Sequence, residues 1–275
     1  MDKISTKNIV EKTLNSLSGD ILRLCVKNES VMSKTKNMNF ELTVIIPVYN
    51  EEDNLERVYE QINEYLKVAS KNTKILFVND GSKDNSLNKI KEICNRSESF
   101  TYCSFERNCG LSAAIKAGFD YSDTPLTGYI DADLQTSPFD FNVLMEYTND
   151  YDLVTGVRSN RKDSFVKNMS SLIANSIRRA FTHDGMDDTG CPLKIIRTDF
   201  AKRIPMFNGL HRFLPAMVLL QNGRIKQVDV RHFPRIAGKS KYNLWNRLLG
   251  PLMDCFAYLW MKKKYINYEV SESKL

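Results

Sequence analysis

Between residues 42 and 131, short apolar segments alternate with amphipathic ones, and this alternation restricts the possible folds more than any other feature of the chain. Strands are predicted at 42–48, 74–78, 100–105 and 126–131, and helices at 53–66, 86–95 and 111–119. Short apolar strands separated by helices are typical of a parallel sheet covered on both faces. Ligands of such sheets bind outside the carboxyl ends of the strands. We therefore predict an α/β fold with its site at that edge.

The second half of the chain keeps this alternation less strictly. Strands are predicted at 152–155, 193–196 and 225–230, and helices at 138–147, 170–181, 210–221 and over most of the last forty residues. The polar, basic stretch 156–167 is predicted to be a mobile loop over the site. A length of 275 residues, 42% of them apolar, allows one sizeable core with appendages. We expect a helical extension and linker at 1–40, a main domain at 41–235, and a basic loop with an amphipathic helix at 236–275.

The strand predicted at 126–131 ends in two carboxylates and an amide. Asp131 and Asp133 share a face of an extended chain because one residue separates them, and Gln135 follows two residues later. Three oxygen donors at a strand end suit a hard divalent cation. Taken alone, however, such an acidic pair is more often a solvated turn.

Two more polar turns, at 47–52 and 79–84, follow predicted strands at the same sheet edge. The carboxylate of Asp80 can accept the N–H groups of a uracil or guanine, and the ring of Tyr49 can stack on a base. In the simpler alternative, Asn50 and Asp84 are helix caps and Asp80 lies in an ordinary turn.

Four motifs, in order, resemble the signature of the inverting family 2 glycosyltransferases, which have a Rossmann-like GT-A fold. They are Pro-Val-Tyr-Asn-Glu at 47–51, Val-Asn-Asp-Gly-Ser-Lys-Asp at 78–84, Arg-Asn-Cys-Gly at 107–110 and Asp-Ala-Asp-Leu-Gln at 131–135. The resemblance covers about residues 42–245. It is closest to the polyprenyl-phosphate branch, which includes dolichol-phosphate mannose synthases and bacterial undecaprenyl-phosphate sugar transferases. It implies a UDP- or GDP-linked sugar donor, a polyprenyl-phosphate acceptor, and Mg²⁺ or Mn²⁺ as a cofactor.

The resemblance also implies roles for individual residues. Asp133 and Gln135 match metal ligands, and Asp131 matches a position near the ribose and a metal-bound water. The family usually has Asp where this chain has Asn79, but we expect little loss because the base contact falls on the next residue. Positions that hold the nucleoside are matched by Pro47, Tyr49, Glu51 and Asp80.

Later motifs imply contacts to the phosphates and the sugar. Arg158, in Gly-Val-Arg at 156–158, matches the element that reaches the donor phosphates, and Asp188 matches the segment that lines the sugar pocket. The segment 211–215 resembles one common in lipid-phosphate transferases. Residues 235–242 resemble the element near the acceptor phosphate, where the basic side chains are Arg235, Lys239 and Lys241. Taken alone, such a segment is more often a solvated basic loop, but together with the other motifs we expect it to bind the acceptor phosphate.

The expected reaction is a single in-line displacement with inversion. Negative charge builds on the leaving nucleoside diphosphate, where a cation on Asp133 and Gln135 and the guanidinium of Arg158 would stabilise it. A lipid monophosphate, with a second pKa of roughly 6, needs no strong base. A sugar hydroxyl would need one, and Asp188 is the candidate for that base or for a sugar contact; alternatively it is a strand cap.

Composition bears on location and partners. The six cysteines are scattered without metal-ligand spacing, which favours a reduced, cytosolic compartment. We expect no signal peptide and no transmembrane helix. The segment 244–260 carries apolar and aromatic residues and is followed by three lysines. We expect it either to lie on the inner face of the cell membrane or to pack on the core. A net charge of +6 is the only feature that favours nucleic acid, which we do not expect as a partner. A homo-oligomer is left open.

Two other functions are considered. The first is a family 2 transferase that acts on a glycan or glycolipid hydroxyl in cell-envelope polysaccharide synthesis, with Asp188 as the base. The second is a non-catalytic scaffold at the membrane surface, against which the intact Asp131, Asp133 and Gln135 argue.

Overall fold

The structure is a computed structural model, and it describes residues 39–158, 176, 178–233, 244–267 and 271–272. The chain divides into two units, Met1–Asn39 and Phe40–Leu275, and the second unit contains the sheet. The predicted N-terminal helical extension lies outside the described residues, as do Arg235, Lys239 and Lys241.

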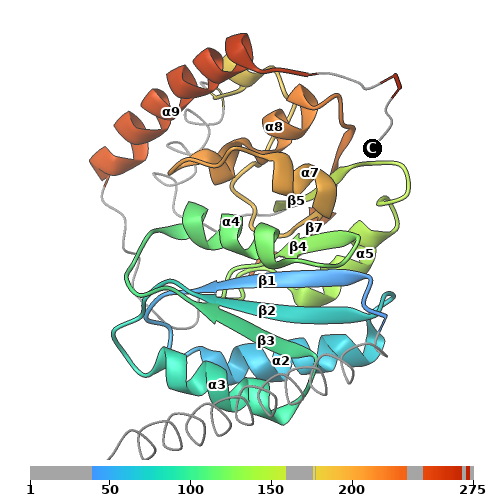
Figure 1. Cartoon of the computed structure of the whole chain (residues 1–275), viewed down its shortest axis with the longest axis vertical. Helices are drawn as coiled ribbons and strands as arrows, with labels where there is room; N and C mark the ends of the chain where they lie inside the picture. The colour runs from blue at the N-terminus through green and yellow to red at the C-terminus, as the bar shows by residue number, and fades with distance from the viewer. Residues whose placement is uncertain (1–38, 159–175, 177, 234–243, 268–270, 273–275) are drawn as a thin grey trace, which may run out of the picture. The chain divides into compact units, whose positions relative to one another are not determined.

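In the described part of the chain, seven strands form one sheet with the order β3-β2-β1-β4-β6-β5-β7 (Figure 1). β6 runs antiparallel to both of its neighbours, and the other pairs are parallel. This confirms the predicted α/β fold with a mostly parallel sheet. The strands are β1 (Leu42–Val48), β2 (Thr73–Asn79), β3 (Phe100–Ser104), β4 (Leu126–Tyr129), β5 (Leu153–Arg158), β6 (Lys194–Arg197) and β7 (Ile225–Val230).

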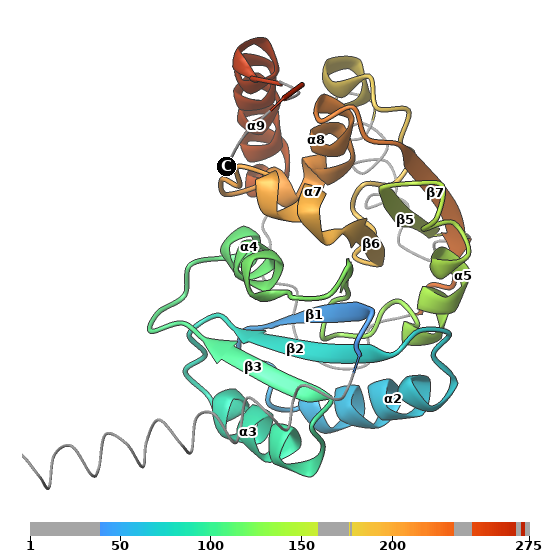
Figure 2. The ribbon, with the colours of Figure 1, turned by 45° about the vertical axis from the view of Figure 1, so that its right-hand side comes forward.

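Helices cover both faces of this sheet, as Figure 2 shows from a second direction. Alternate residues of β1 point to opposite faces, so Val44 and Ile46 join one buried cluster and Ile45 joins the other. The first face is covered by α2 (Leu55–Val68), α3 (Ser86–Arg96) and α5 (Phe141–Met145). On the other side lie α4 (Leu111–Tyr121), α7 (Thr198–Arg203), α8 (Leu214–Leu220) and α9 (Leu244–Lys264).

Two predicted helices are divided in the structure. The segment 138–147 forms a 3-10 turn, η2 (Pro138–Asp140), before α5, and 210–221 forms η3 (Leu210–Phe213) before α8. The second break is explained by Pro215, which lies in the first turn of α8. Proline has no N–H to donate, and its ring clashes with the carbonyl four residues earlier, so it cannot lie inside a continuous helix without breaking it. α7 was not predicted. Of the predicted helix 170–181, residues 176 and 178–181 are described, and they are helical.

The predicted loop at 156–167 begins too early, because β5 continues to Arg158 and pairs there with β7. Gly156 permits this pairing. A Cβ atom at Gly156 would lie 2.7 Å from a methyl group of Val230 and 2.9 Å from the sulfur of Cys191. Residues 159–167 lie outside the described part of the chain.

The strand register brings the polar turns to one edge of the sheet. Val48 lies opposite Asn79, and Tyr129 at the end of β4 lies opposite Lys194 at the start of β6. Because β6 is antiparallel, its first residue meets the carboxyl ends of the other strands. β1 lies between β2 and β4, where the strand order reverses and where ligands of such sheets bind.

Candidate functional site

The turns that follow β1 and β2 are joined by reciprocal hydrogen bonds. The N–H of Asn50 donates to the hydroxyl of Ser82 (3.0 Å), and the N–H of Lys83 donates to the amide oxygen of Asn50 (2.8 Å). The N–H of Glu52 also donates to the carboxylate of Asp84 (3.2 Å). Asn50 is therefore not a helix cap: it has a positive φ of 53° and links the two turns.

Asp80 supports the loop that follows β3. Its buried carboxylate accepts hydrogen bonds from the N–H of Cys109 (2.6 Å), the N–H of Gly110 (2.9 Å) and the side-chain amide of Asn108 (2.8 Å). Gly81 allows the close approach, since a Cβ atom there would lie 2.3 Å from the carbonyl carbon of Arg107. This supporting role was not predicted, and a contact of Asp80 with a base stays a prediction.

The other residues predicted to hold a nucleoside lie beside these turns. Pro47, Tyr49 and Glu51 are half-buried at and just beyond the end of β1. Glu51 accepts a hydrogen bond from the amide of Asn54 (2.6 Å), the residue before α2. The nucleoside positions are thus gathered next to the carboxyl ends of β1 and β2.

The acidic motif leaves the end of β4 as a tight turn. Leu134 has a φ of 51°, a left-handed conformation that is uncommon for a residue with a side chain. Asp133 is 8% exposed; its carboxylate accepts the N–H of Gln135 (3.1 Å), and its carbonyl accepts a hydrogen bond from Arg57 of α2 (2.7 Å). The hydroxyl of Tyr129 donates to the carboxylate of Asp131.

The electrostatics of this turn suit a divalent cation. Burial and the neighbouring Asp133 raise the pKa of Asp131 to about 6, against the hydrogen bond from Tyr129. A cation would relieve this repulsion between the carboxylates. Within the described residues, no three His, Cys, Asp or Glu side chains are grouped to hold a metal. A cation would thus rely on these carboxylates, on the amide of Gln135, and on phosphate and water oxygens, as Mg²⁺ commonly does.

Arg158 and Asp188 form a bidentate ion pair across the same edge. The Nε of Arg158 donates to Oδ2 of Asp188 (2.8 Å), and its Nη2 donates to Oδ1 (3.0 Å). Burial lowers the pKa of Arg158, but the bonds to Asp188 outweigh it and raise the pKa. The side chain of Asp188 is 6% exposed, so this carboxylate is positioned by Arg158. Two residues predicted to face the phosphates and the sugar therefore meet.

Lys194, the first residue of β6, was not predicted as part of the site. It is buried, and its ammonium group donates to the carbonyls of Cys191 and Thr189, in the segment that carries Asp188. Burial lowers its pKa. A signal was present in the sequence, because a lysine inside a strand expected to be buried on both faces must find partners there.

His211 lies against the first turn of α4. Its Nδ1 is 2.8 Å from the hydroxyl of Ser112, which accepts the N–H of Gly209 (3.0 Å). Burial and the nearby charges of Arg212 and Lys194 lower the pKa of His211 to about 3. The imidazole is therefore neutral near pH 7.

α9 has one packed face and one exposed face. Cys255 and Tyr258 are buried, and the ring of Tyr258 stacks on Phe213 with the centroids 5.7 Å apart. The exposed side carries Met253, Phe256, Leu259 and Trp260 and is followed by Lys262, Lys263 and Lys264. Among the described helices, none has the length and apolarity needed to cross a membrane.

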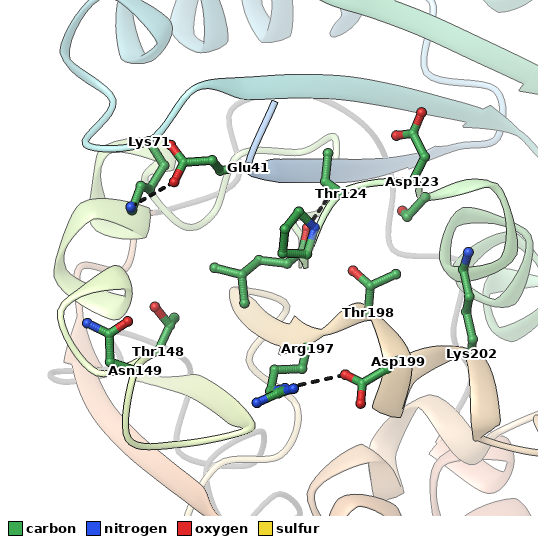
Figure 3. Close-up of a pocket in the computed structure, with 13 residues that line it drawn as sticks. Glu41, Lys71, Asp123, Thr124, Thr148, Asn149, Arg197, Thr198, Asp199 and Lys202 are labelled. Atoms are coloured by element: carbon green, nitrogen blue, oxygen red, sulfur yellow. Dashed lines mark hydrogen bonds and ion pairs between the residues drawn. The ribbon is translucent and has the colours of Figure 1, made fainter. Parts of the chain in front are cut away.

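A groove of about 820 Å³ lies at the opposite edge of the sheet, next to the start of β1 and of β4 (Figure 3). Its charged groups largely neutralise each other. Lys71 pairs with Glu41 at 2.8 Å, and Arg197 pairs with Asp199 at 3.3 Å. This groove is remote from the carboxyl ends of the parallel strands, and we do not assign the site to it.

The chain is similar to known proteins in both sequence and structure. Residues 43–204 match the sequence model described as "Glycosyl transferase family 2". The chain is 32% identical over 228 residues to an undecaprenyl-phosphate 4-deoxy-4-formamido-L-arabinose transferase from Edwardsiella ictaluri, with 82% of this chain and 70% of the relative covered. It is 29% identical over 231 residues to a dodecaprenyl-phosphate galacturonate synthase from Rhizobium johnstonii, with coverages of 82% and 68%.

Solved structures share the fold. Glucosyl-3-phosphoglycerate synthase from Mycobacterium tuberculosis, solved with Mn²⁺, UDP and glucosyl-3-phosphoglycerate, superposes with a TM-score of 0.63 at 14% identity, over 81% of this chain and 80% of that one. A mannosyltransferase from Pyrobaculum calidifontis, solved with GDP-Man and Mn²⁺, gives a TM-score of 0.58 at 15% identity, with coverages of 81% and 64%.

Proposed function

The chain belongs to glycosyl transferase family 2, and from this premise we propose that it transfers a sugar from a nucleoside-diphosphate donor to a polyprenyl phosphate with inversion. The observation that carries the proposal is the electrostatic interaction of Asp131, in the acidic turn, with Arg158, which is itself paired with Asp188 at the carboxyl edge of the sheet. The acceptor class rests on the two relatives, whose names state dodecaprenyl phosphate and undecaprenyl phosphate.

The donor would lie across the ends of β1, β2 and β4. Pro47, Tyr49, Glu51 and Asp80 would hold the nucleoside, and Asp131 would face the ribose. The base is uracil or guanine, because solved structures of this fold carry either UDP or a GDP-linked sugar. Asp80 would contact the base directly or would position the 107–110 loop, to which it is hydrogen-bonded, against the base.

A divalent cation, Mg²⁺ or Mn²⁺, would be held by Asp133 and Gln135, with Asp131 beside it, and would neutralise charge on the diphosphate. The residues fit this cation because two carboxylates already repel each other there. Arg158 would supply a fixed positive charge to the diphosphate. To contact the phosphates, its guanidinium would give up one of its hydrogen bonds to Asp188 and donate to a phosphate oxygen instead.

In the transfer step an oxygen of the acceptor phosphate attacks the anomeric carbon. The new carbon–oxygen bond forms as the bond from that carbon to the β-phosphate breaks, and the electron pair leaves with the nucleoside diphosphate. The acceptor is mostly a dianion near pH 7, so no side chain has to remove a proton. Asp188, whose carboxylate pairs with Arg158, would contact a sugar hydroxyl, and Arg235, Lys239 and Lys241 would bind the acceptor phosphate.

We also propose that the protein lies on the inner face of the cytoplasmic membrane through α9. The exposed apolar and aromatic side chains of α9, followed by three lysines, suit the interface of an anionic leaflet. The buried face of the same helix would fix the domain against that surface. The sequence left core packing and membrane contact as alternative roles for this segment. Because α9 has one buried and one exposed face, it can have both roles.

A thermal-shift screen tests the donor, and a transfer assay tests the acceptor. We expect UDP- or GDP-linked sugars to stabilise the protein when Mg²⁺ or Mn²⁺ is present, and the stabilising donor to glycosylate a short polyprenyl phosphate. Transfer only to a glycan or glycolipid hydroxyl, lost in Asp188→Asn, would favour the second candidate function. The buried carboxylate of Asp188 is the observation behind that candidate.

A further inference from the structure

The chain that follows β7 folds back along the acidic turn. The N–H of Phe233 donates to the carbonyl of Gln135 (2.8 Å), and His232 pairs with Thr136 in an isolated antiparallel bridge. Residues 231–233 therefore act as a short extra strand beside 135–137. Gln135 is held through its backbone by a segment that is almost one hundred residues later in the chain.

An ion pair anchors this extra strand. Arg231 donates to Asp140 with its backbone N–H (2.8 Å to Oδ2), its Nε (2.8 Å to Oδ1) and its Nη2 (2.6 Å to Oδ1). Its Nη2 also donates to the hydroxyl of Ser137 (3.2 Å). Asp140 is 4% exposed, so its carboxylate is largely removed from water and depends on these donors. Both Ser137 and Asp140 belong to the segment just after the acidic motif.

The sheet order shows what this attachment spans. Two strands, β6 and β5, separate β4 from β7, so the end of β7 is roughly 14 Å from the end of β4 at the usual strand spacing. The segment 131–140 crosses this distance, and Figures 1 and 2 show α5, which follows it, next to β5 and β7. Val230 lies opposite Arg158 in the β5 and β7 pair. The attachment thus fixes Gln135 relative to Arg158.

We propose that Arg231 and Asp140 are positioning residues that hold Gln135 in place as a ligand of the cation. The inference rests on the proposed function, in which Gln135 is such a ligand. Neither residue touches the reacting atoms. Side chains that orient metal ligands without binding the metal commonly change metal affinity by 10- to 100-fold when they are replaced.

Two variants and one control test the proposal. Arg231→Gln removes the charge and the fork of donors, and Asp140→Asn keeps the shape of the acceptor. Arg96→Gln is the control, because Arg96 is also partly exposed and pairs with Glu56, but it joins α3 to α2 away from the acidic turn. Binding of Mn²⁺ is titrated by electron paramagnetic resonance with UDP and, separately, with GDP, and hydrogen exchange follows the amide of Phe233.

We expect Arg231→Gln and Asp140→Asn each to need about tenfold more Mn²⁺ for half-saturation and to lose protection of the Phe233 amide, whereas Arg96→Gln does neither. We also expect the double variant to bind Mn²⁺ no more weakly than either single variant, because both substitutions break the same contact between Arg231 and Asp140. Lost protection with unchanged Mn²⁺ affinity would overturn the positioning role, as would unchanged protection. If the wild-type protein fails to bind Mn²⁺ both in the presence of UDP and in the presence of GDP, the proposed function fails and the inference fails with it.

Discussion

His211 should make the protein lose stability as the pH falls below about 6.5. Burial, followed by the charges of Arg212 and Lys194, lowers the pKa of the folded imidazole from 6.5 to about 3. Between these two values the unfolded chain binds a proton that the native state excludes, so stability is present above pH 6.5 and falls as the pH falls. At 1.36 kcal/mol per pH unit, lowering the pH from about 7.5 to about 5 removes about 2 kcal/mol.

The assay is urea unfolding of the wild type and of His211→Asn at these two pH values. We expect the variant to lack about 2 kcal/mol of the pH-dependent loss, whatever its stability at pH 7.5. His183→Asn is the matched control, because His183 is exposed and its φ of 52° is tolerated by asparagine. Equal pH dependence in the wild type and His211→Asn would refute the neutral, buried imidazole.

Three further changes test other parts of the structure. Lys194→Met should reduce kcat/KM at least about tenfold, because it leaves two carbonyls beside Asp188 without their donor; wild-type kcat/KM in a folded variant would contradict this. Gly81→Ala should cost about 2–4 kcal/mol in urea unfolding, because of its φ of 63° and the 2.3 Å approach to the backbone of Arg107, and a loss below about 0.5 kcal/mol would argue against that packing. Replacing Phe256 and Trp260 by serine should abolish pelleting with anionic liposomes while Tyr121→Ser, at an exposed tyrosine of α4, does not; equal pelleting would remove the membrane role of α9.

The sequence predicted the strands because local patterns determine them, and the edge assigned to the candidate site follows from where those strands end. The apolar run 42–48 is bounded by polar residues and becomes β1 over the same residues. The direction of β6 had no such pattern, since an apolar run reads the same in both directions. A lysine inside a buried strand is a signal that it has partners, but the proximity of Lys194 to Asp188 depends on β6 being antiparallel, which the sequence did not indicate.

Within the site, the residues that carry motifs were predictable and those that support them were not. Asp131, Asp133 and Gln135 are close in sequence, so their proximity in space follows from local geometry. Arg57 donates to the backbone carbonyl of Asp133, and Arg231 donates to the carboxylate of Asp140. In the local sequence, however, Arg57 is an ordinary charged residue on a helix, and Arg231 is one that follows an edge strand. Tertiary contacts of this kind leave no period or spacing in a single sequence.

The role of Asp133 in holding the cation at the diphosphate is tested most directly by transfer kinetics of Asp133→Asn. The assay follows sugar transfer from the stabilising donor to a short polyprenyl phosphate with Mn²⁺, and circular dichroism checks the fold. Asp123→Asn is the control, at the opposite edge of the sheet. We predict a loss of at least about 100-fold in kcat/KM, or about 2.7 kcal/mol, with the fold intact. Near-normal turnover by Asp133→Asn would contradict the assignment of this turn as the metal and diphosphate centre.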